Sequence, residues 1–450
     1  METKTTSSNN VIEALSQLED AVRNALGSAR SYLNRTFKII EGENNAKSGG
    51  WTQFLNETDK HPSSTGTAHG ILALLACGEP VNSETAVLAI RYLESCQCND
   101  GGWTKPSLHN KCSLTRITGL SLRAFLDSKS HQSSPTIKKG IDWLINSQNT
   151  DGGWGNTAKD EQSDVTSTSF ALQVLTRIIG LSQNERNGIQ RGQAWLLKAR
   201  NADHSWGHTT NNQGTVAQTS EAIDGLLACG HSVASLKETT LWLEQHIETG
   251  GQFSERYLIP AGPSAKESVM WTQVSKERGL ITLLALNSGL TSPQVVNAVK
   301  DILSRQVTGA HWKAEAFQNS EPIWAIKEAV VALRAFLNRV ENNRASVVLS
   351  EEIINLRQEL GAAQKQIQEL QDRETKRAWK NKIKNLWVKT PKLSAGLLIG
   401  TILLTVVYVV FRHYKHQPEY ADYMVAVASF VGLGFSIYPV IRENTRGGKK

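Results

Sequence analysis

The stretch QNTDGGWGN (residues 148–156) places Asp-Gly-Gly-Trp inside a chain whose apolar periodicity otherwise indicates helices. A near-copy, QCNDGGWTK (residues 97–105), lies 51 residues earlier. Glycine adopts the left-handed conformation that ends a helix, and a second glycine allows a sharp turn. The tryptophan can then cover the joint, while the glutamine amide binds backbone groups that the turn frees. We therefore interpret four residues as structural: Gln97, Trp103, Gln148 and Trp154.

The turn recurs along the chain at spacings of 47 to 59 residues. Its aromatic residue is Trp51, Trp103, Trp154, Trp206, Phe253 or Trp312. Each turn is followed by a helical run whose fourth position is small, which lets neighbouring helices approach closely. Six helix–turn–helix repeats over residues 25–340 predict an all-α fold, an (α/α)6 toroid with six inner and six outer helices. The alternative is an open solenoid of helix pairs.

The chain resembles the superfamily of α/α toroids that contains the terpenoid cyclases and the protein prenyltransferases. The two complete Gln-x-x-Asp-Gly-Gly-Trp turns look like the QW motif of squalene-hopene-type cyclases, and the other four turns are degenerate. The resemblance covers about residues 25–340. It implies a toroid that acts on an isoprenoid substrate.

The catalytic acid that the resemblance implies is incomplete in this chain. Cyclases of this type protonate the substrate with the middle Asp of D-x-D-D-T-A, and the matching stretch here begins at Asp164 but continues with Thr166 and Ser167. A hydroxyl group is far too weak an acid to protonate an alkene. Asp164 is therefore the catalytic candidate only if the protein is an enzyme. The D-x-C zinc pair of the prenyltransferases does not occur.

A zinc site around the second turn is the weaker of two interpretations. Cys96, Cys98, His109 and Cys112 have ligand chemistry, but the Cys-x-Cys spacing is tighter than usual and no other repeat carries an equivalent. Buried cysteines without a metal are the favoured interpretation, so no cofactor is expected. We expect His204 and His208, beside the fourth turn, to be exposed.

Variable positions of the inner helices should line the lumen, the space at the centre of the ring. They mix both signs of charge with few aromatics, which suits a polar or amphiphilic small molecule, or a peptide end, better than a carbocation. The alternative is that the charges pair with one another. The ligand-binding candidates are His69, Arg116, Phe170, Glu221, Asp224, Arg278, Trp324 and Glu328.

Five further segments flank the repeats. We predict a polar helical lead (1–24), a coiled coil (345–378), a basic juxtamembrane segment (379–392), two transmembrane helices (393–411 and 423–441) and a basic tail (442–450). A heptad pattern over residues 349–370 predicts a homo-oligomer, with a single helix packing back on the toroid as the alternative.

The charge distribution bears on partners and location. The net charge is +7, but residues 373–450 carry 14 Lys/Arg against 4 Asp/Glu, so the repeats themselves are slightly acidic and nucleic acid is not an expected partner. Basic residues flank both apolar segments, which predicts an integral protein of the inner or plasma membrane with toroid and both termini cytoplasmic. The predicted function is a ligand- or partner-binding sensor or scaffold coupled to an oligomerising membrane hairpin. The alternative is an atypical cyclase or prenyl-transfer-like enzyme acting on a membrane-derived isoprenoid.

Overall fold

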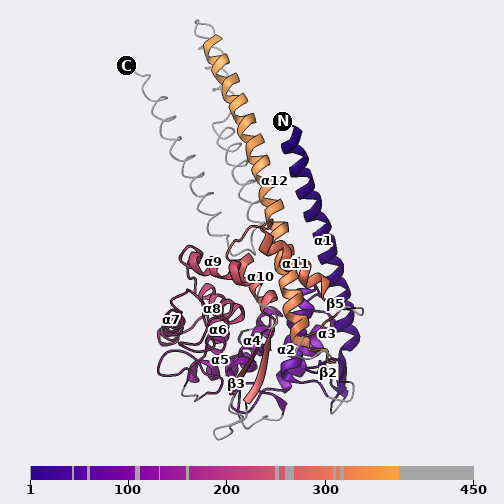
Figure 1. Ribbon diagram of the computed structural model, residues 1–450, viewed down its shortest axis with the longest axis vertical. Helices are drawn as coiled ribbons and strands as arrows, with labels where there is room; N and C mark the ends of the chain where they lie inside the picture. Colours follow the sequence, from indigo (N-terminus) through magenta and orange to yellow (C-terminus); the bar gives the residue numbers. More distant parts are fainter. Residues whose placement is uncertain are drawn as a thin grey trace, which may run out of the picture. The chain divides into compact units, whose positions relative to one another are not determined.

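The computed structural model describes residues 2–42, 45–57, 61–106, 112–130, 132–158, 162–248, 253–258, 268–307, 311–314 and 319–373. The chain divides into two compact units, Met1–Val347 and Val348–Lys450. The first unit contains all six repeats, and the helices of the repeats gather in one body (Figure 1).

Each repeat consists of an outer helix, a turn and an inner helix. The outer helices are α1 (Glu2–Thr36), α3 (Glu84–Ser95), α5 (Pro135–Asn146), α7 (Gln183–Lys198), α9 (Lys237–His246) and α11 (Pro293–Ser304). The inner helices are α2 (Ser64–Ala76), α4 (Thr115–Asp127), α6 (Val165–Leu175), α8 (Val216–Ala228), α10 (Ser275–Ala285) and the first part of α12 (Ile323–Arg373).

The inner helices form a closed ring. Each of α2, α4, α6, α8 and α10 packs against the next in the series. At the closure, the Arg334 Nε of α12 donates to the Ala76 carbonyl of α2 over 2.7 Å, and the Ile323 amide donates to the Gln53 carbonyl over 3.1 Å. On its other side α12 meets α10, since Glu328 lies 3.6 Å from Arg278. The ring is therefore a toroid and not an open solenoid.

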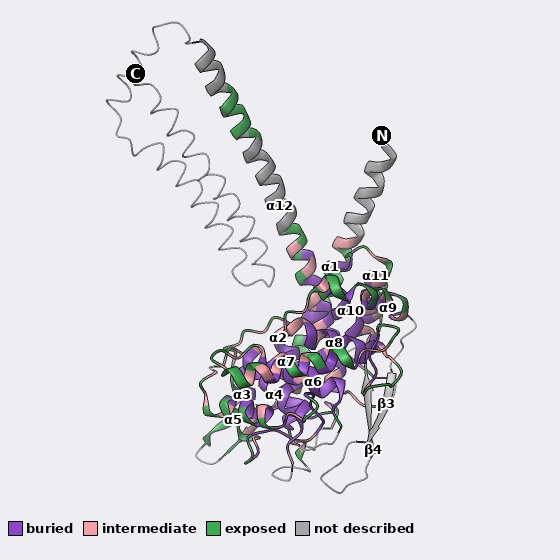
Figure 2. Ribbon diagram, turned by 90° about the vertical axis from the view of Figure 1, so that its left-hand side faces the viewer, coloured by how far each residue is buried: buried purple, intermediate pink, exposed green. Residues whose placement is uncertain are grey.

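Polar caps and apolar faces explain where these helices form. Ser, Thr or Asp accepts a backbone hydrogen bond at the start of many of them, for example Ser63 at α2, Asp164 at α6 and Ser182 at α7. Inner helices such as α2 and α6 are buried nearly all round, whereas outer helices such as α3 and α5 bury one stripe (Figure 2). Leu18 and Val22 of α1 already lie in the core.

Among the described residues, three small antiparallel hairpins depart from the all-helical prediction. They pair β1 (Lys38–Glu41) with β2 (Lys47–Gly50), β3 (Phe253–Leu258) with β4 (Ser268–Gln273), and β5 (Gln306–Val307) with β6 (His311–Trp312). A short 3-10 helix, Val233–Leu236, precedes α9. Phe253, the predicted counterpart of the turn tryptophans, begins β3 and pairs with Gln273. The first, fifth and sixth turns thus carry extra strands that the second, third and fourth lack within the described residues.

The prediction of an integral membrane protein requires correction. Among the residues that the structure describes, no helix is long and apolar enough to cross a bilayer. The longest, α12, carries charged residues throughout its length and so lacks the apolar run that a bilayer requires. The predicted segments 379–392, 393–411, 423–441 and 442–450 lie outside the described residues, as do residues 374–378 of the predicted coiled coil. The helix expected there is present from residue 345 to Arg373 as part of α12, while its pairing stays a prediction.

Candidate functional site

The Gly-Gly-Trp turns hold neighbouring repeats together. Gly101 and Gly152 both have a φ of +96°, which a side chain would strain. The indoles of Trp103 and Trp154 are fully buried and donate to the carbonyls of Leu93 and Leu144, each over 2.8 Å.

The two glutamines reach across to the next repeat. The Gln97 amide donates to the Gly101 and Thr136 carbonyls, both at 2.8 Å. In the same way the Gln148 amide donates to Gly152 over 2.7 Å and to Gly188 over 2.8 Å. Thr136 and Gly188 lie on the following outer helices, so each turn is bonded to the helix after it.

The aspartates of these turns form a second bond between repeats that sequence reasoning missed. The Asp100 carboxylate accepts from the Trp143 indole over 3.0 Å, and Asp151 accepts from the Trp195 indole over 2.9 Å. A signal was available, because an aromatic residue followed by Leu recurs in the outer helix that precedes each of the first five turns. From this recurrence, the aromatic residue could have been predicted to contact the aspartate of the preceding turn.

Asp164 is an ionised, fully engaged carboxylate. It caps α6 and is 4% exposed. Its Oδ1 accepts from Arg116 Nη2 over 2.9 Å and from the Ser167 amide over 2.8 Å, and its Oδ2 accepts from the Ser167 hydroxyl over 2.7 Å. Burial alone would raise the pKa of Asp164, but Arg116 and the hydrogen bonds from Ser167 outweigh it and hold that pKa below its ordinary value. Such a carboxylate is a poor proton donor.

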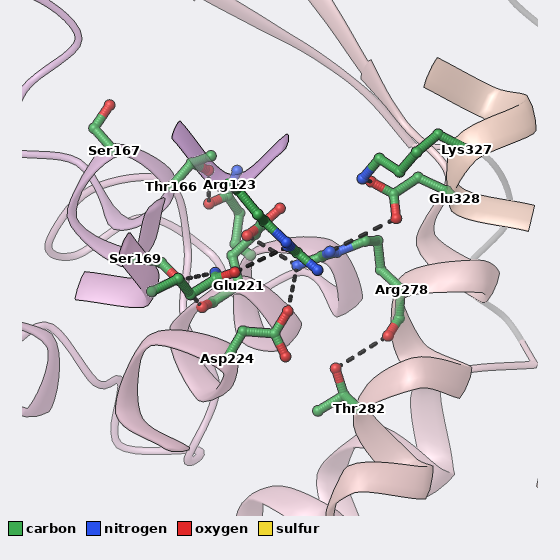
Figure 3. A network of polar contacts seen from close by, with 12 residues as sticks. Arg123, Thr166, Ser167, Ser169, Glu221, Asp224, Arg278, Thr282, Lys327 and Glu328 are labelled. Atoms are coloured by element: carbon green, nitrogen blue, oxygen red, sulfur yellow. Dashed lines mark hydrogen bonds and ion pairs between the residues drawn. The ribbon is translucent and has the colours of Figure 1, made fainter. Parts of the chain in front are cut away.

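A charge network crosses the lumen with Arg278 at its centre (Figure 3). Arg278 Nη2 lies 2.8 Å from Glu221 and 2.8 Å from Asp224, both on α8, and Nη1 lies 3.6 Å from Glu328 on α12. Lys327, which is 3% exposed, pairs with Glu328. We call Glu221, Asp224, Arg278, Lys327 and Glu328 the lumen network. Its charges largely pair with one another.

Two carboxyl groups of the lumen network differ sharply in acidity. Burial raises the pKa of Glu221 to about 7, with the Asp224 and Glu328 carboxylates adding to burial and Arg278 opposing it. Burial also acts to raise the pKa of Glu328, but Lys327 and Arg278 outweigh it and lower that pKa to about 2. The pKa of His69 falls to about 3, mainly through burial and then through Lys327, so its imidazole is neutral. Glu221 is thus the group of the network that exchanges a proton near neutrality.

Only some of the predicted ligand-binding residues come together. His69, Glu221, Asp224, Arg278 and Glu328 face the same network. The others lie elsewhere: Arg116 pairs with Asp164, Phe170 packs against Gly119 of α4, and Trp324 packs beside Val274, Ala314 and Ala325.

Two charged residues near the lumen were not among the predicted candidates. Lys327 pairs with Glu328, and Arg123 donates to the Gln173 side chain over 3.0 Å. Arg123 occupies a lumen-facing position of the repeat, which was a usable signal, whereas Lys327 could be placed only once its burial was known.

The second turn shows no metal cluster in the part of the chain that is described. Cys96, Cys98 and Cys112 are not in disulfides, and burial raises the pKa of Cys96 to about 11. No group of three or more metal-ligating side chains occurs among the described residues, and His109 lies outside them. His208 is half-buried rather than exposed, and burial lowers its pKa to about 4.

Comparison with known proteins places the chain near the terpenoid cyclases. Residues 115–215 match the family model of the squalene-hopene cyclase C-terminal domain. The squalene–hopene cyclase of Zymomonas mobilis is 24% identical over 249 residues, which are 48% of this chain and 37% of that protein. A probable squalene–hopene cyclase of Sinorhizobium fredii is 27% identical over 195 residues, 37% of this chain and 29% of its own length.

Among solved structures, the type II terpene cyclase MstE from Scytonema, in complex with geranylgeranyl dihydroxybenzoate, superimposes with a TM-score of 0.47. That match is 11% identical and covers 72% of this chain and 99% of the other. The chain spans about a third of the length of the curated relatives given above. The matched residues 115–215 contain the Gly-Gly-Trp turn at Trp154, the degenerate turn at Trp206 and Asp164, so the similarity to squalene-hopene cyclases includes the region of the implied acid.

Proposed function

We propose that the toroid is a binding module built on a terpenoid-cyclase-like ring, and that it does not start a cyclisation by protonating its ligand. The observation that carries the proposal is the Arg116–Asp164 ion pair. Asp164, the one carboxylate left in the stretch that matches the acid motif, is buried, ionised and bonded three times. Deprotonation leaves no proton to give, and Thr166 and Ser167 cannot replace it.

The lumen network favours a polar or amphiphilic ligand. A polyprene cation is stabilised by apolar and aromatic walls, whereas the residues that meet here are charged or neutral-polar. A charged group on the ligand can take the place of one of the ion-pair partners of Arg278 or Glu328. Each of these residues pairs with more than one charge, so it keeps a partner when another is displaced. Arg278 is therefore the residue on which binding should depend most.

A second candidate is a terpenoid cyclase-like enzyme with an atypical acid. The comparisons favour this candidate over a sensor, because the relatives named above are squalene–hopene cyclases. Within the lumen network, Glu221 has the acidity closest to that of a usable general acid at neutral pH. The substrate class would be a squalene-like polyprene.

One experiment separates the two candidates. The purified full chain is incubated with squalene, and the extract is examined by gas chromatography and mass spectrometry. We expect no cyclic hydrocarbon above a boiled control. Cyclic product from the wild type that is lost in Glu221→Gln or Asp164→Asn would establish the enzyme and refute the binding module.

A parallel measurement tests binding directly. Native mass spectrometry of the purified chain should detect a polar small molecule that is lost in Arg278→Gln. Arg177→Gln is the matched control, because Arg177 forms its ion pair with Asp127, away from the lumen network. Equal retention by all three proteins would contradict a role for the lumen network.

A further inference from the structure

A cavity lies where the ring closes, and it shares no residue with the lumen network. It has a volume of about 380 Å³ and lies between α1, the end of α2 and α12. We call it the closure pocket; the residues that matter here are Arg23, Leu26, Gly27, Arg30, Arg334 and Leu337. Its volume falls in the range of small-molecule sites, roughly 300–1,000 Å³. We propose that the closure pocket binds a phosphomonoester, a small molecule with a terminal phosphate on an apolar body.

One wall of the pocket is a face of α1 with a glycine at its middle. Arg23, Gly27 and Arg30 follow each other by four and three residues, so they share one face of the helix. Glycine destabilises a helix interior relative to alanine. A Cβ at Gly27 would have no atom within 4 Å, so no neighbouring side chain or backbone requires a glycine there. Its effect is to leave space in the pocket.

The opposite wall supplies a guanidinium that needs an anion. Arg334 Nε donates to the Ala76 carbonyl over 2.7 Å, which fixes the side chain at the pocket. Among the described residues no carboxylate pairs with Arg334. This separates it from Arg30, which pairs with Glu79 at 2.9 Å.

The third guanidinium is held by carboxylates. Arg23 lies 2.8 Å from Glu19 and 2.7 Å from Glu341. These ion pairs orient Arg23 and Arg30, whereas Arg334 remains available for a ligand. Guanidinium groups bind phosphate oxygens through paired N–H donors, and a doubly charged phosphate accepts from several of them at once.

Apolar side chains lie beneath the pocket, whose own surface is mainly polar. Leu26 and Leu337 are almost completely buried beneath it, as is the thiol of Cys77. A ligand body attached to the phosphate can contact the aliphatic stems of the lining arginines, which inorganic phosphate cannot do. The same phosphate chemistry occurs in free metabolites and in lipid headgroups, and the experiment below distinguishes them.

Isothermal titration of the full chain tests the proposal with three probes: phenyl phosphate, inorganic phosphate, and vesicles containing phosphatidic acid beside vesicles of phosphatidylcholine alone. We expect saturable binding of phenyl phosphate, at least tenfold tighter than inorganic phosphate. Arg334→Gln should weaken it at least tenfold by removing the available cation. Gly27→Leu should do the same by filling the pocket, and it should fold because leucine favours the helix.

The controls are Arg177→Gln and Gly361→Leu. Gly361 is also a helix glycine with no atom within 4 Å of a Cβ, but it lies outside the pocket. Binding that is confined to phosphatidic acid vesicles and lost in both pocket variants would assign the phosphate to a lipid headgroup. Absence of saturable binding to any probe, or equal affinity in the wild type and both pocket variants, would overturn the proposal.

Discussion

At the scale of single residues, two buried carboxyl groups have pKa values shifted in opposite directions. Asp164 and Glu221 are both buried carboxyl groups beside an arginine. Asp164 also accepts two hydrogen bonds from Ser167, which keep it ionised. Glu221 shares its arginine with Asp224 and Glu328, so burial prevails and its pKa rises to about 7. Hydrogen bonds from Ser167 at one site, and burial with a cation shared among several carboxylates at the other, account for the difference.

The shifted pKa of Glu221 predicts a pH-dependent stability. The group titrates at 4.5 when unperturbed and at about 7 in the folded chain, so folding favours its protonated form. Its contribution is complete below pH 4.5 and is lost as the pH rises to about 7. Compared with Glu221→Gln, the wild type should lose about 3 kcal/mol of unfolding free energy between pH 4.5 and 8. Chemical denaturation of both proteins across this range measures the loss.

The control for this measurement is the same substitution at Glu94, an exposed residue of α3. Glu94→Gln should follow the wild type at every pH. A difference between wild type and Glu221→Gln that stays constant with pH would show that Glu221 titrates normally and that burial does not dominate its environment.

At the scale of elements, the turns add specific hydrogen bonds to the helix packing that joins neighbouring repeats. A turn such as 148–154 is bonded to its own repeat through the Trp154 indole and to the next outer helix through Gln148 and Asp151. The tryptophan and the aspartate therefore have separable roles. One fills the joint within a repeat, and the other ties two repeats together.

This division predicts two different losses of stability. Trp154→Ala should destabilise the toroid by about 3–5 kcal/mol, because it removes a fully buried indole. Asp151→Asn removes the negative charge that accepts from the Trp195 indole and the Ser163 hydroxyl, and should cost about 1–3 kcal/mol. His204→Ala, at an exposed residue beside the fourth turn, should be nearly silent. Thermal melts that are equal for Trp154→Ala and wild type would refute the structural role of the turn.

At the scale of the whole molecule, the sequence repeat predicted the ring of helix pairs but not the pairing of charges in its lumen. Six turns at a regular spacing predict six helix pairs, because each pair can bury its apolar faces only against its neighbours. Closure depends on contacts between the first and last repeats, such as Arg334 with Ala76, which lie 258 residues apart. Sequence spacing carries no information on such contacts.

The lumen residues were only partly predictable for a related reason. The repeat frame identifies which helix positions turn inward, and His69, Glu221, Arg278 and Glu328 were found in this way. It does not say which partner each charge selects. Arg116 therefore appeared to be a lumen cation, although it pairs with Asp164 where α4 and α6 begin. The hairpins β1–β2 and β3–β4 were missed because the long links that contain them have no repeat to compare with.

The last prediction is that the protein assembles as a homo-oligomer through the heptad face of α12. The heptad pattern over residues 349–370 lies on α12, and Leu360, one of its apolar positions, is 59% exposed. An exposed leucine on a helix of this pattern indicates a face that a second copy can cover.

A coiled coil of three heptads is only marginally stable by itself, so charges introduced into its apolar positions should abolish pairing. Leu356→Asp with Leu360→Asp would require a desolvated carboxylate at each position. We expect the full-length wild type to be a homo-oligomer by sedimentation equilibrium and the double variant to be a folded monomer, while Gln358→Ala, a change at an exposed residue of the same helix, should leave the oligomer intact. Wild type and double variant that sediment alike would mean that this face does not mediate assembly.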